Sequence, residues 1–243
     1  MNDRPLVSVV IPVWNHTREL ARCLASLKRQ TYPSLEIIAV DDGSSDNPRV
    51  VVETSQSPVK FVRLETNRGA SAARNEGARL ATGEYLLFLD ADAVLRPDAV
   101  ERMAGALAAH PEAAFAYPSF RFGWKLFRSG AFNADRLRRE PYIHTTALLR
   151  RSLFPGFDES LKKFQDWDLW LSMADQGASG IWIDDVLFTL SVGRKGMSAW
   201  LPSFFHHVPW SWLGWMPREL KQYRYWEKVV KEKHQIKGKE YGI

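Results

Sequence analysis

Residues 67–92 read NRGASAARNEGARLATGEYLLFLDAD, and this stretch indicates the fold class of the chain. Its first part, 70–81, is rich in alanine and arginine, which predicts a helix that ends near Gly83. Residues 84–89 then predict a strand, because apolar side chains follow one another without a break. Two carboxylates in an Asp-x-Asp pattern close the stretch. A helix that leads into a strand is the unit from which α/β domains are built.

Strand and helix patterns alternate on both sides of this stretch. The β-branched run 7–13 predicts a buried strand. Leu20, Cys23, Leu24 and Leu27 follow it with the spacing of one helical face, so Cys23 belongs to the core. Further elements are expected as strands at 36–40 and 59–64 and as a helix at 97–109. Strands separated by helices predict right-handed βαβ units and a mainly parallel sheet flanked by helices.

The pattern is less regular after residue 112. A strand is possible at 113–117, and residues 121–141 are basic, aromatic and irregular. Beyond them we expect a strand at 142–149, a helix at 166–176 and β structure at 181–190. The sequence contains no internal repeat and no flexible linker. One continuous α/β domain with an irregular C-terminal third is therefore predicted.

The composition is that of an ordinary globular protein. Of the 243 residues, 45% are hydrophobic and 25% charged, which excludes disordered and collagen-like architectures. The net charge of +5 is too small to argue for nucleic-acid binding. The single cysteine excludes an intrachain disulfide, and the N-terminal residues lack the features of a signal peptide. We therefore expect a cytoplasmic protein.

The stretch from 196 to 217 contains 22 residues without a formal charge when histidine is neutral. That length is sufficient to span a bilayer. Three prolines interrupt it, and a lone span would leave backbone groups without partners. Its aromatic residues instead favour an interfacial or packing surface, which allows peripheral contact with a membrane.

Polar side chains follow each predicted strand of the first half. Ligands of open parallel sheets bind beyond the carboxyl ends of the strands, so these side chains are expected to share one site. Neither GxGxxG after the first strand nor GxxxxGK[ST] is present, which argues against dinucleotide-binding and P-loop enzymes. Asp90 and Asp92 suit Mg²⁺ or Mn²⁺, since such ions take few protein ligands and use substrate oxygens for the rest. The alternative is an acidic pair that caps the next helix.

Four separated stretches resemble the family 2 glycosyltransferases. They are VSVVIPVWN (7–15), VDDGSSDN (40–47), residues 67–92 and FQDWDLWLSMADQG (164–177), in the order of that family. The resemblance covers about residues 6–192. It implies an inverting transferase with the GT-A nucleotide-sugar-binding fold over 1–195. Residues 196–243 are then an aromatic, basic extension on the acceptor side or at a membrane surface.

The resemblance assigns the nucleotide site residue by residue. Pro12, Trp14 and Asn15 match the wall of the base and ribose pocket. Asp42 matches the residue that recognises the base, typically uracil, whereas Asp41 supports the turn. Arg68 and Arg74 match a segment near the diphosphate, where a planar guanidinium suits phosphate oxygens. Asp92 matches the metal ligand of the family, with Asp90 near the ribose or a metal-bound water.

The resemblance also implies a catalytic base. Asp166 matches the acid that deprotonates the acceptor hydroxyl, and the alternative is a cap of a helix that begins at Trp167. Gln165 departs from the usual glutamate, and the lost negative charge is expected to lower the pKa of Asp166. A second departure is a missing histidine near residue 194. Three alternatives follow: the metal has one fewer protein ligand, Arg194 and Lys195 partly neutralise the diphosphate, or His206 or His207 folds back toward the metal. Candidate residues on the acceptor side are Trp124, His144, Trp167, Arg194 and Lys195.

The implied reaction moves a sugar from a nucleotide donor, with a UDP-sugar favoured, to an acceptor hydroxyl. The basic and aromatic segment 121–139 suits a glycan or a lipid-linked acceptor, or an anionic membrane surface. Nucleic acid is an unlikely partner. Two rival interpretations remain. One is a glycosyltransferase-like module that binds nucleotide sugars without turnover. The other is a haloacid-dehalogenase-like phosphatase, suggested by LLFLDADAV, although that motif normally lies on the first strand of its domain.

Overall fold

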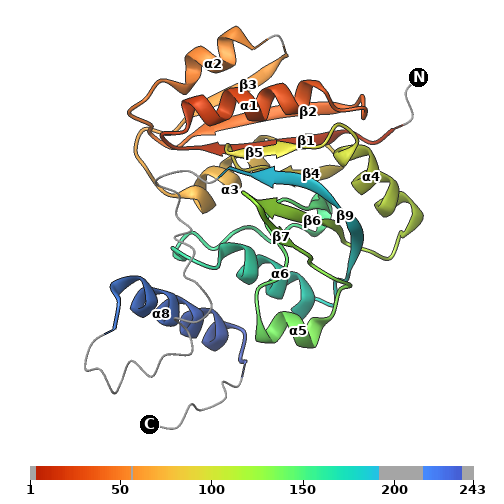
Figure 1. The fold of residues 1–243 in the computed structure, drawn as a ribbon, viewed down its shortest axis with the longest axis vertical. Helices are drawn as coiled ribbons and strands as arrows, with labels where there is room; N and C mark the ends of the chain where they lie inside the picture. Colours follow the sequence, from red (N-terminus) through yellow and green to blue (C-terminus); the bar gives the residue numbers. More distant parts are fainter. Residues whose placement is uncertain (1–3, 56, 192–215, 237–243) are drawn as a thin grey trace.

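One mixed sheet organises the part of the chain that the structure describes. The computed structural model describes residues 4–55, 57–191 and 216–236 (Figure 1). The strand order is β3-β2-β1-β4-β8-β6-β9-β5, with β7 paired to β6. The strands are β1 (Val7–Val13), β2 (Leu35–Asp41), β3 (Val59–Arg63), β4 (Tyr85–Phe88), β5 (Ala93–Leu95), β6 (Phe115–Phe122), β7 (Lys125–Phe127), β8 (Leu148–Arg150) and β9 (Gly180–Leu190). The helices are α1 (Thr17–Lys28), α2 (Pro48–Thr54), α3 (Ala70–Leu80), α4 (Ala99–Ala109), α5 (Ala134–Arg139), α6 (Gln165–Asp175) and α8 (Arg218–Lys233).

The first half of the sheet is parallel. β1 pairs with both β2 and β4, and β2 pairs with β3, all in parallel register. β9 also runs parallel to β6, whereas β5, β7 and β8 form short antiparallel pairings. The prediction of an α/β fold with a mainly parallel sheet flanked by helices is therefore confirmed.

Helices cover both faces of the sheet because its central strands are apolar on both sides. Val9 and Ile11 of β1 belong to the core layer shared with α1 and α4. Val10 belongs to the opposite layer, shared with α3, α6 and α8. Cys23 has no exposed surface, which confirms its predicted place in the core. The alternation of β1 thus places one strand between two hydrophobic layers.

A glycine lets α3 approach β1 closely. A Cβ atom on Gly77 would lie 2.2 Å from Cγ1 of Val10, which is closer than two carbon atoms can approach. The helix therefore packs with its backbone almost against the strand. This contact fixes α3, and with it the side chains that α3 directs toward the strand ends.

A cluster of ion pairs fastens α8 to α6. Nε2 of His234 lies 2.9 Å from Oδ1 of Asp168, and its Nδ1 lies 2.7 Å from Oδ2 of Asp175. Nζ of Lys233 reaches the same Asp168 and, at 2.7 Å, Asp158. Burial alone would lower the pKa of His234, but the two carboxylates outweigh it and raise that pKa. We call these contacts the α8 latch.

Residues 142–147 do not form the strand that their composition predicts, and only Leu148–Arg150 joins the sheet as β8. Their polar backbone groups are satisfied locally. The amide of Thr146 donates to Nδ1 of His144 at 3.0 Å, and Trp170 Nε1 donates to the carbonyl of Ile143 at 3.1 Å. Groups that bond within the loop and to α6 are not available for a ladder.

The described part of the chain contains elements that the sequence does not predict. Short ones are α2, β5, β7 and α5, and a longer one is the helix α8 in the basic C-terminal segment. Most of the uncharged stretch 196–217 and the expected domain boundary at residue 195 lie outside the described residues. Among the helices of the described ranges, none has both the length and the apolar content needed to cross a bilayer.

Candidate active site

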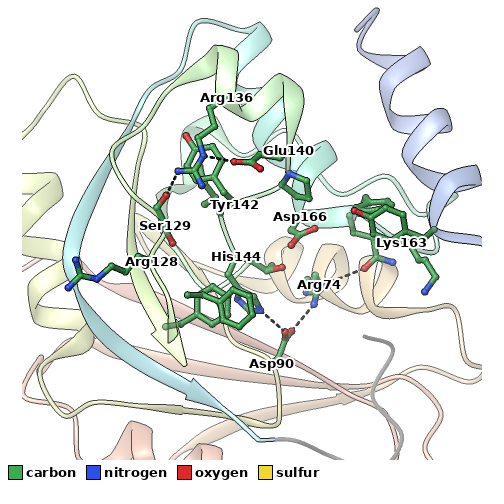
Figure 2. A pocket seen from close by; sticks show the side chains of 18 of the residues that line it. Arg74, Asp90, Arg128, Ser129, Arg136, Glu140, Tyr142, His144, Lys163 and Asp166 are labelled. Carbon is green, nitrogen blue, oxygen red and sulfur yellow. Dashed lines mark hydrogen bonds and ion pairs between the residues drawn. The ribbon is translucent and has the colours of Figure 1, made fainter. Parts of the chain in front are cut away.

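Two cavities meet beyond the carboxyl ends of β1, β2 and β4. The first, which we call the strand-end cavity, has a volume of about 280 Å³ and includes Trp14, Asp42 and Asp92 in its lining. The second, the helix-side cavity, has a volume of about 520 Å³ and includes Asp166 at the start of α6 (Figure 2). Both volumes fall near or within the range of small-molecule sites. The residues that line both cavities are Arg74, Asp90 and His144.

The floor of the strand-end cavity is a loop held by a buried carboxylate. Asp42, only 2% exposed, accepts hydrogen bonds from the backbone amides of Arg68 and Gly69, each at 2.7 Å. Gly69 has a φ of 95°, a conformation that favours glycine. The Asp42 oxygens retain lone pairs beyond these two bonds. The carboxylate therefore shapes the loop and still lines the cavity.

The loops after β1 and β2 are tied to each other. Asn15, at a φ of 56°, accepts hydrogen bonds through Oδ1 from the amide and hydroxyl of Ser45 at 2.8 and 2.9 Å. Asp41 accepts from the amide of Ser44 and pairs with Arg63 at 2.9 Å, as its predicted supporting role requires. Pro12 and Trp14 line the cavity, and Trp14 is 50% exposed. A half-exposed indole offers a flat apolar wall to a ligand.

Arg74 connects the two cavities from α3. Its Nη2 donates to Oδ1 of Asp90 at 2.7 Å, and its Nη1 donates to Oε1 of Gln165 at 3.2 Å. The guanidinium also lies 5.3 Å from the ring centre of Phe157. Although Arg74 is only 5% exposed, its Nε has no hydrogen-bond partner in the described part. The side chain thus links Asp90, which follows β4, to Gln165, the residue before Asp166 (Figure 2).

His144 faces the acidic residues of both cavities. Its Nδ1 accepts the hydrogen bond from Thr146, so the neutral ring carries its proton on Nε2. That Nε2 lies 3.8 Å from Oδ2 of Asp90. Burial lowers the pKa of His144, although Asp90 and Asp166 act in the opposite direction. A neutral imidazole therefore stands at neutral pH between these two carboxylates.

Asp90 and Asp92 differ in how their charge is balanced. Burial opposes ionisation of Asp90, but the charge and hydrogen bond of Arg74, together with His144 and His16, outweigh it and lower the pKa of Asp90. Asp92 forms no ion pair with a described residue, and burial followed by the charge of Asp90 raises its pKa to about 6. Two close carboxylates with one unpaired charge suit a divalent cation.

The fit to a metal is partial on protein ligands alone. Within the described ranges, no group of three or more His, Cys, Asp or Glu side chains is arranged to hold an ion. Asp90 and Asp92 nonetheless supply hard oxygen donors beside a cavity with room for further oxygens. A Mg²⁺ or Mn²⁺ ion held there would need ligands from a substrate, as such ions commonly take.

Asp166 lies in the first turn of α6. The residue before α6 is Phe164, in a left-handed conformation. The capping alternative requires Asp166 to be the residue that precedes the helix, and it is not. Its Oδ1 accepts a hydrogen bond from the amide of Trp167 at 2.8 Å. Burial raises the pKa of Asp166, against the opposing effects of His144, the amide of Trp167 and Arg74. The carboxylate is directed into the helix-side cavity (Figure 2).

Other predicted site residues lie apart from the cavities. The guanidinium of Arg68 pairs with Glu159 at 3.0 Å, so only its backbone contributes to the loop. Trp167 is 1% exposed and donates through Nε1 to the carbonyl of Leu137, which places it in the core. Trp124 is 87% exposed and lines neither cavity. The predicted residues Arg194, Lys195, His206 and His207 lie outside the described residues.

Sequence reasoning missed two kinds of lining residue. His16 and Glu19 line the strand-end cavity from the start of α1, directly after the predicted Asn15. The rule that examines residues beyond each strand would have reached them. Tyr223 lines the helix-side cavity from α8, where its ring contacts Phe164 at a centroid distance of 4.8 Å. A helix at the other end of the chain leaves no local signal of this contact.

Comparisons with known proteins identify the family of the chain. The family model described as Glycosyl transferase family 2 matches residues 8–157. A PGL/p-HBAD biosynthesis glycosyltransferase of Mycobacterium bovis is 32% identical over 177 residues, which cover 68% of each chain. The chain spans only 30–38% of the length of three other curated glycosyltransferases that it matches.

Solved structures share the fold. Residues 1–349 of Staphylococcus aureus TarS, in complex with UDP-GlcNAc, match with a TM-score of 0.68 and 22% identity, covering 83% of this chain and 64% of that one. The mannosyltransferase PcManGT from Pyrobaculum calidifontis, in complex with GDP-Man and Mn²⁺, matches with a TM-score of 0.65 and 24% identity, covering 82% and 60%. Together with the family match over more than half of the sequence, these findings show that the chain belongs to glycosyltransferase family 2.

Proposed function

We propose that this chain transfers a sugar from a nucleoside-diphosphate donor, with UDP-sugars favoured, to the hydroxyl of a glycan or lipid-linked acceptor, and that it does so in the cytoplasm. One observation carries the proposal. The cavity that contains Asp92 and the cavity that contains Asp166 share a wall made of Arg74, Asp90 and His144. A donor in the strand-end cavity and an acceptor in the helix-side cavity would meet at that wall.

The donor side rests on the strand-end cavity. Trp14 and Asp42 would receive the nucleoside, with the indole against the base and the carboxylate near a ring N–H. Solved relatives with the same fold bind UDP-GlcNAc and GDP-Man, which supports a nucleotide-sugar donor. Asp92 and Asp90 would hold Mg²⁺ or Mn²⁺, which would supply positive charge to the departing diphosphate.

The acceptor side rests on Asp166. Its carboxylate would accept the proton of the acceptor hydroxyl as that oxygen attacks the anomeric carbon, opposite the leaving nucleotide, so that the configuration inverts. The raised pKa of Asp166 makes it a stronger base than an exposed aspartate. Arg74 would position Asp90, and Gln165 would keep that guanidinium directed at the shared wall.

Release of nucleotide from a panel of nucleotide sugars tests the proposal. With Mg²⁺ or Mn²⁺ and candidate acceptors, we expect release that depends on both the acceptor and the metal. A module that binds without turnover would show a thermal shift with a donor and no release. Two findings set the phosphatase alternative aside. The chain belongs to a glycosyltransferase family, and the motif LLFLDADAV begins on β4 and not on the first strand.

The Asp92→Asn variant tests the metal assignment. We expect it to weaken the stabilisation that UDP and Mn²⁺ together give to the folded chain, while metal-independent binding of UDP persists. Metal-dependent binding that remained at the wild-type level would exclude Asp92 as a metal ligand.

A further inference from the structure

The β6–β7 hairpin presents two exposed apolar side chains. The strands are joined by the two-residue turn Gly123-Trp124, in which Gly123 has a φ of 57°. Trp124 is 87% exposed and Leu126 is 40% exposed. Arg121 is opposite Leu126 in the register of the strands, so these two side chains share one face of the hairpin.

The opposite face of the hairpin packs inward. The rings of Phe120 and Phe127 stack at a centroid distance of 4.9 Å, and Phe120 stacks on Phe188 of β9 at 5.1 Å. The hairpin is thus anchored to the sheet by three rings. The exposure of Trp124 and Leu126 therefore does not come from a loosely attached segment.

The exposed face carries unbalanced positive charge. No acidic residue occurs between Glu112 and Asp135 in the sequence. Arg121 and Arg128 are exposed, and neither forms an ion pair with a residue that the structure describes. The next arginine along the chain differs, since Arg136 pairs with Glu140 at 2.7 Å.

We propose that Arg121, Trp124, Leu126 and Arg128, which we call the hairpin face, bind an anionic lipid surface. An indole and an aliphatic side chain beside arginines suit the boundary between head groups and acyl chains. Cations near an anionic membrane each contribute about 1 kcal/mol of attraction. A single-stranded nucleic acid would instead need a basic groove with several stacking rings, whereas the hairpin face offers one exposed ring.

The position of the hairpin gives this contact a consequence. Phe127 and Arg128 also line the helix-side cavity, so a bilayer at the hairpin face would lie beside the opening of that cavity. An acceptor carried by a lipid would then reach Asp166 without leaving the membrane. This last step rests on the proposed function, whereas binding to the lipid surface does not.

Co-sedimentation of the full chain with vesicles tests the proposal without a donor or an acceptor. We expect binding to vesicles of phosphatidylglycerol and phosphatidylcholine, and much weaker binding to phosphatidylcholine alone. Arg121→Gln and Arg128→Gln should each weaken binding about fivefold, which corresponds to about 1 kcal/mol. Trp124→Ser should weaken it roughly tenfold or more through the loss of apolar contact.

Two matched variants serve as controls. Arg29→Gln removes an exposed cation after α1, and Leu153→Ser removes an exposed apolar side chain that is 45% exposed. Both should bind vesicles like the wild-type chain. Unfolding curves of all five variants would show that each is folded, and Trp124→Phe provides a second, milder change at the turn.

Three results would overturn the proposal. They are no binding by the wild-type chain, equal binding to neutral vesicles, and hairpin variants that bind as well as the controls. Tighter binding to a single-stranded oligonucleotide than to vesicles, lost in the same variants, would assign the hairpin face to nucleic acid instead. None of these results bears on nucleotide release, so the proposed transferase activity stands or falls separately.

Discussion

The carboxylate of Asp42 makes a quantitative prediction possible, because each of its oxygens accepts a hydrogen bond from a backbone amide. The amides of Arg68 and Gly69 donate to Oδ1 and Oδ2 at 2.7 Å each. Hydrogen bonds to charged groups contribute about 1.5–3 kcal/mol each. Asp42→Asn keeps one acceptor, removes the charge and turns the other oxygen into a donor that faces an N–H. We therefore expect the free energy of unfolding to fall by about 2 kcal/mol.

Urea unfolding at pH 7 measures this change. A thermal midpoint falls by about 2–4 °C per kcal/mol in a chain of this size, so Tm should fall by about 4–8 °C. Asp46→Asn is the matched control. Its Oδ2 accepts one bond, from the amide of Thr17 at 2.9 Å, while Oδ1 has no partner among the described residues. Asparagine can keep that single bond, so we expect a change within about 0.5 kcal/mol.

Equal stability of the Asp42→Asn and Asp46→Asn variants would refute this reasoning. It would mean that the loop from 67 to 69 is held by contacts other than the Asp42 carboxylate. The same pair of variants then separates two roles of Asp42. A loss of UDP binding at a temperature where both variants are folded would show a direct role in recognition.

Three further predictions concern stability and rate. The pKa of His234 is higher in the folded chain than its value of about 6.5 in the unfolded chain, so protonated His234 stabilises the fold fully below about pH 6.5. This stabilisation is lost as pH rises through the folded-state pKa. In urea unfolding, His234→Gln should therefore destabilise the chain more at pH 5.5 than at pH 9. An unchanged difference would contradict the α8 latch. Gly77→Ala should lower the free energy of unfolding by about 1–3 kcal/mol because its Cβ meets a valine of β1, whereas Gly105→Ala, where nothing lies within 4 Å, should not destabilise. Gln165→Glu adds a negative charge beside Asp166, which should raise the pKa of Asp166 and move the acidic limb of the pH–rate profile for transfer to higher pH. An acidic limb that stayed in place would argue against Asp166 as the titrating base.

The amino-acid sequence is sufficient to predict the parallel half of the fold and one edge of the site. Runs such as 7–13 and 84–89 are apolar enough to be strands buried on both faces, and parallel strands bring their carboxyl ends together. For this reason the strand pattern by itself places Asp42, Asp90 and Asp92 near one another. Asp166 is identified by the family resemblance, since its own sequence context favours a helix cap.

Contacts between distant residues cannot be read from the sequence. Arg74 is directed at Asp90 and Gln165, whereas Arg68 is drawn away to Glu159 by an ion pair that spans 91 residues. Residues 142–147 have the composition of a strand, but His144 bonds within its own loop. Periodicity describes the neighbours of a residue along one element. It carries no information on which distant charge a side chain meets.

The most direct test of the account compares donor binding and transfer in the Asp166→Asn variant. We expect nucleotide-sugar affinity to match that of the wild-type chain, because Asp166 lines only the helix-side cavity. Transfer should fall by at least about 10²-fold, the lower range for loss of a general base. Asp184→Asn, a change at an exposed acid on β9, should leave both unchanged. Transfer by Asp166→Asn within a few-fold of wild type would contradict the central claim that this carboxylate deprotonates the acceptor.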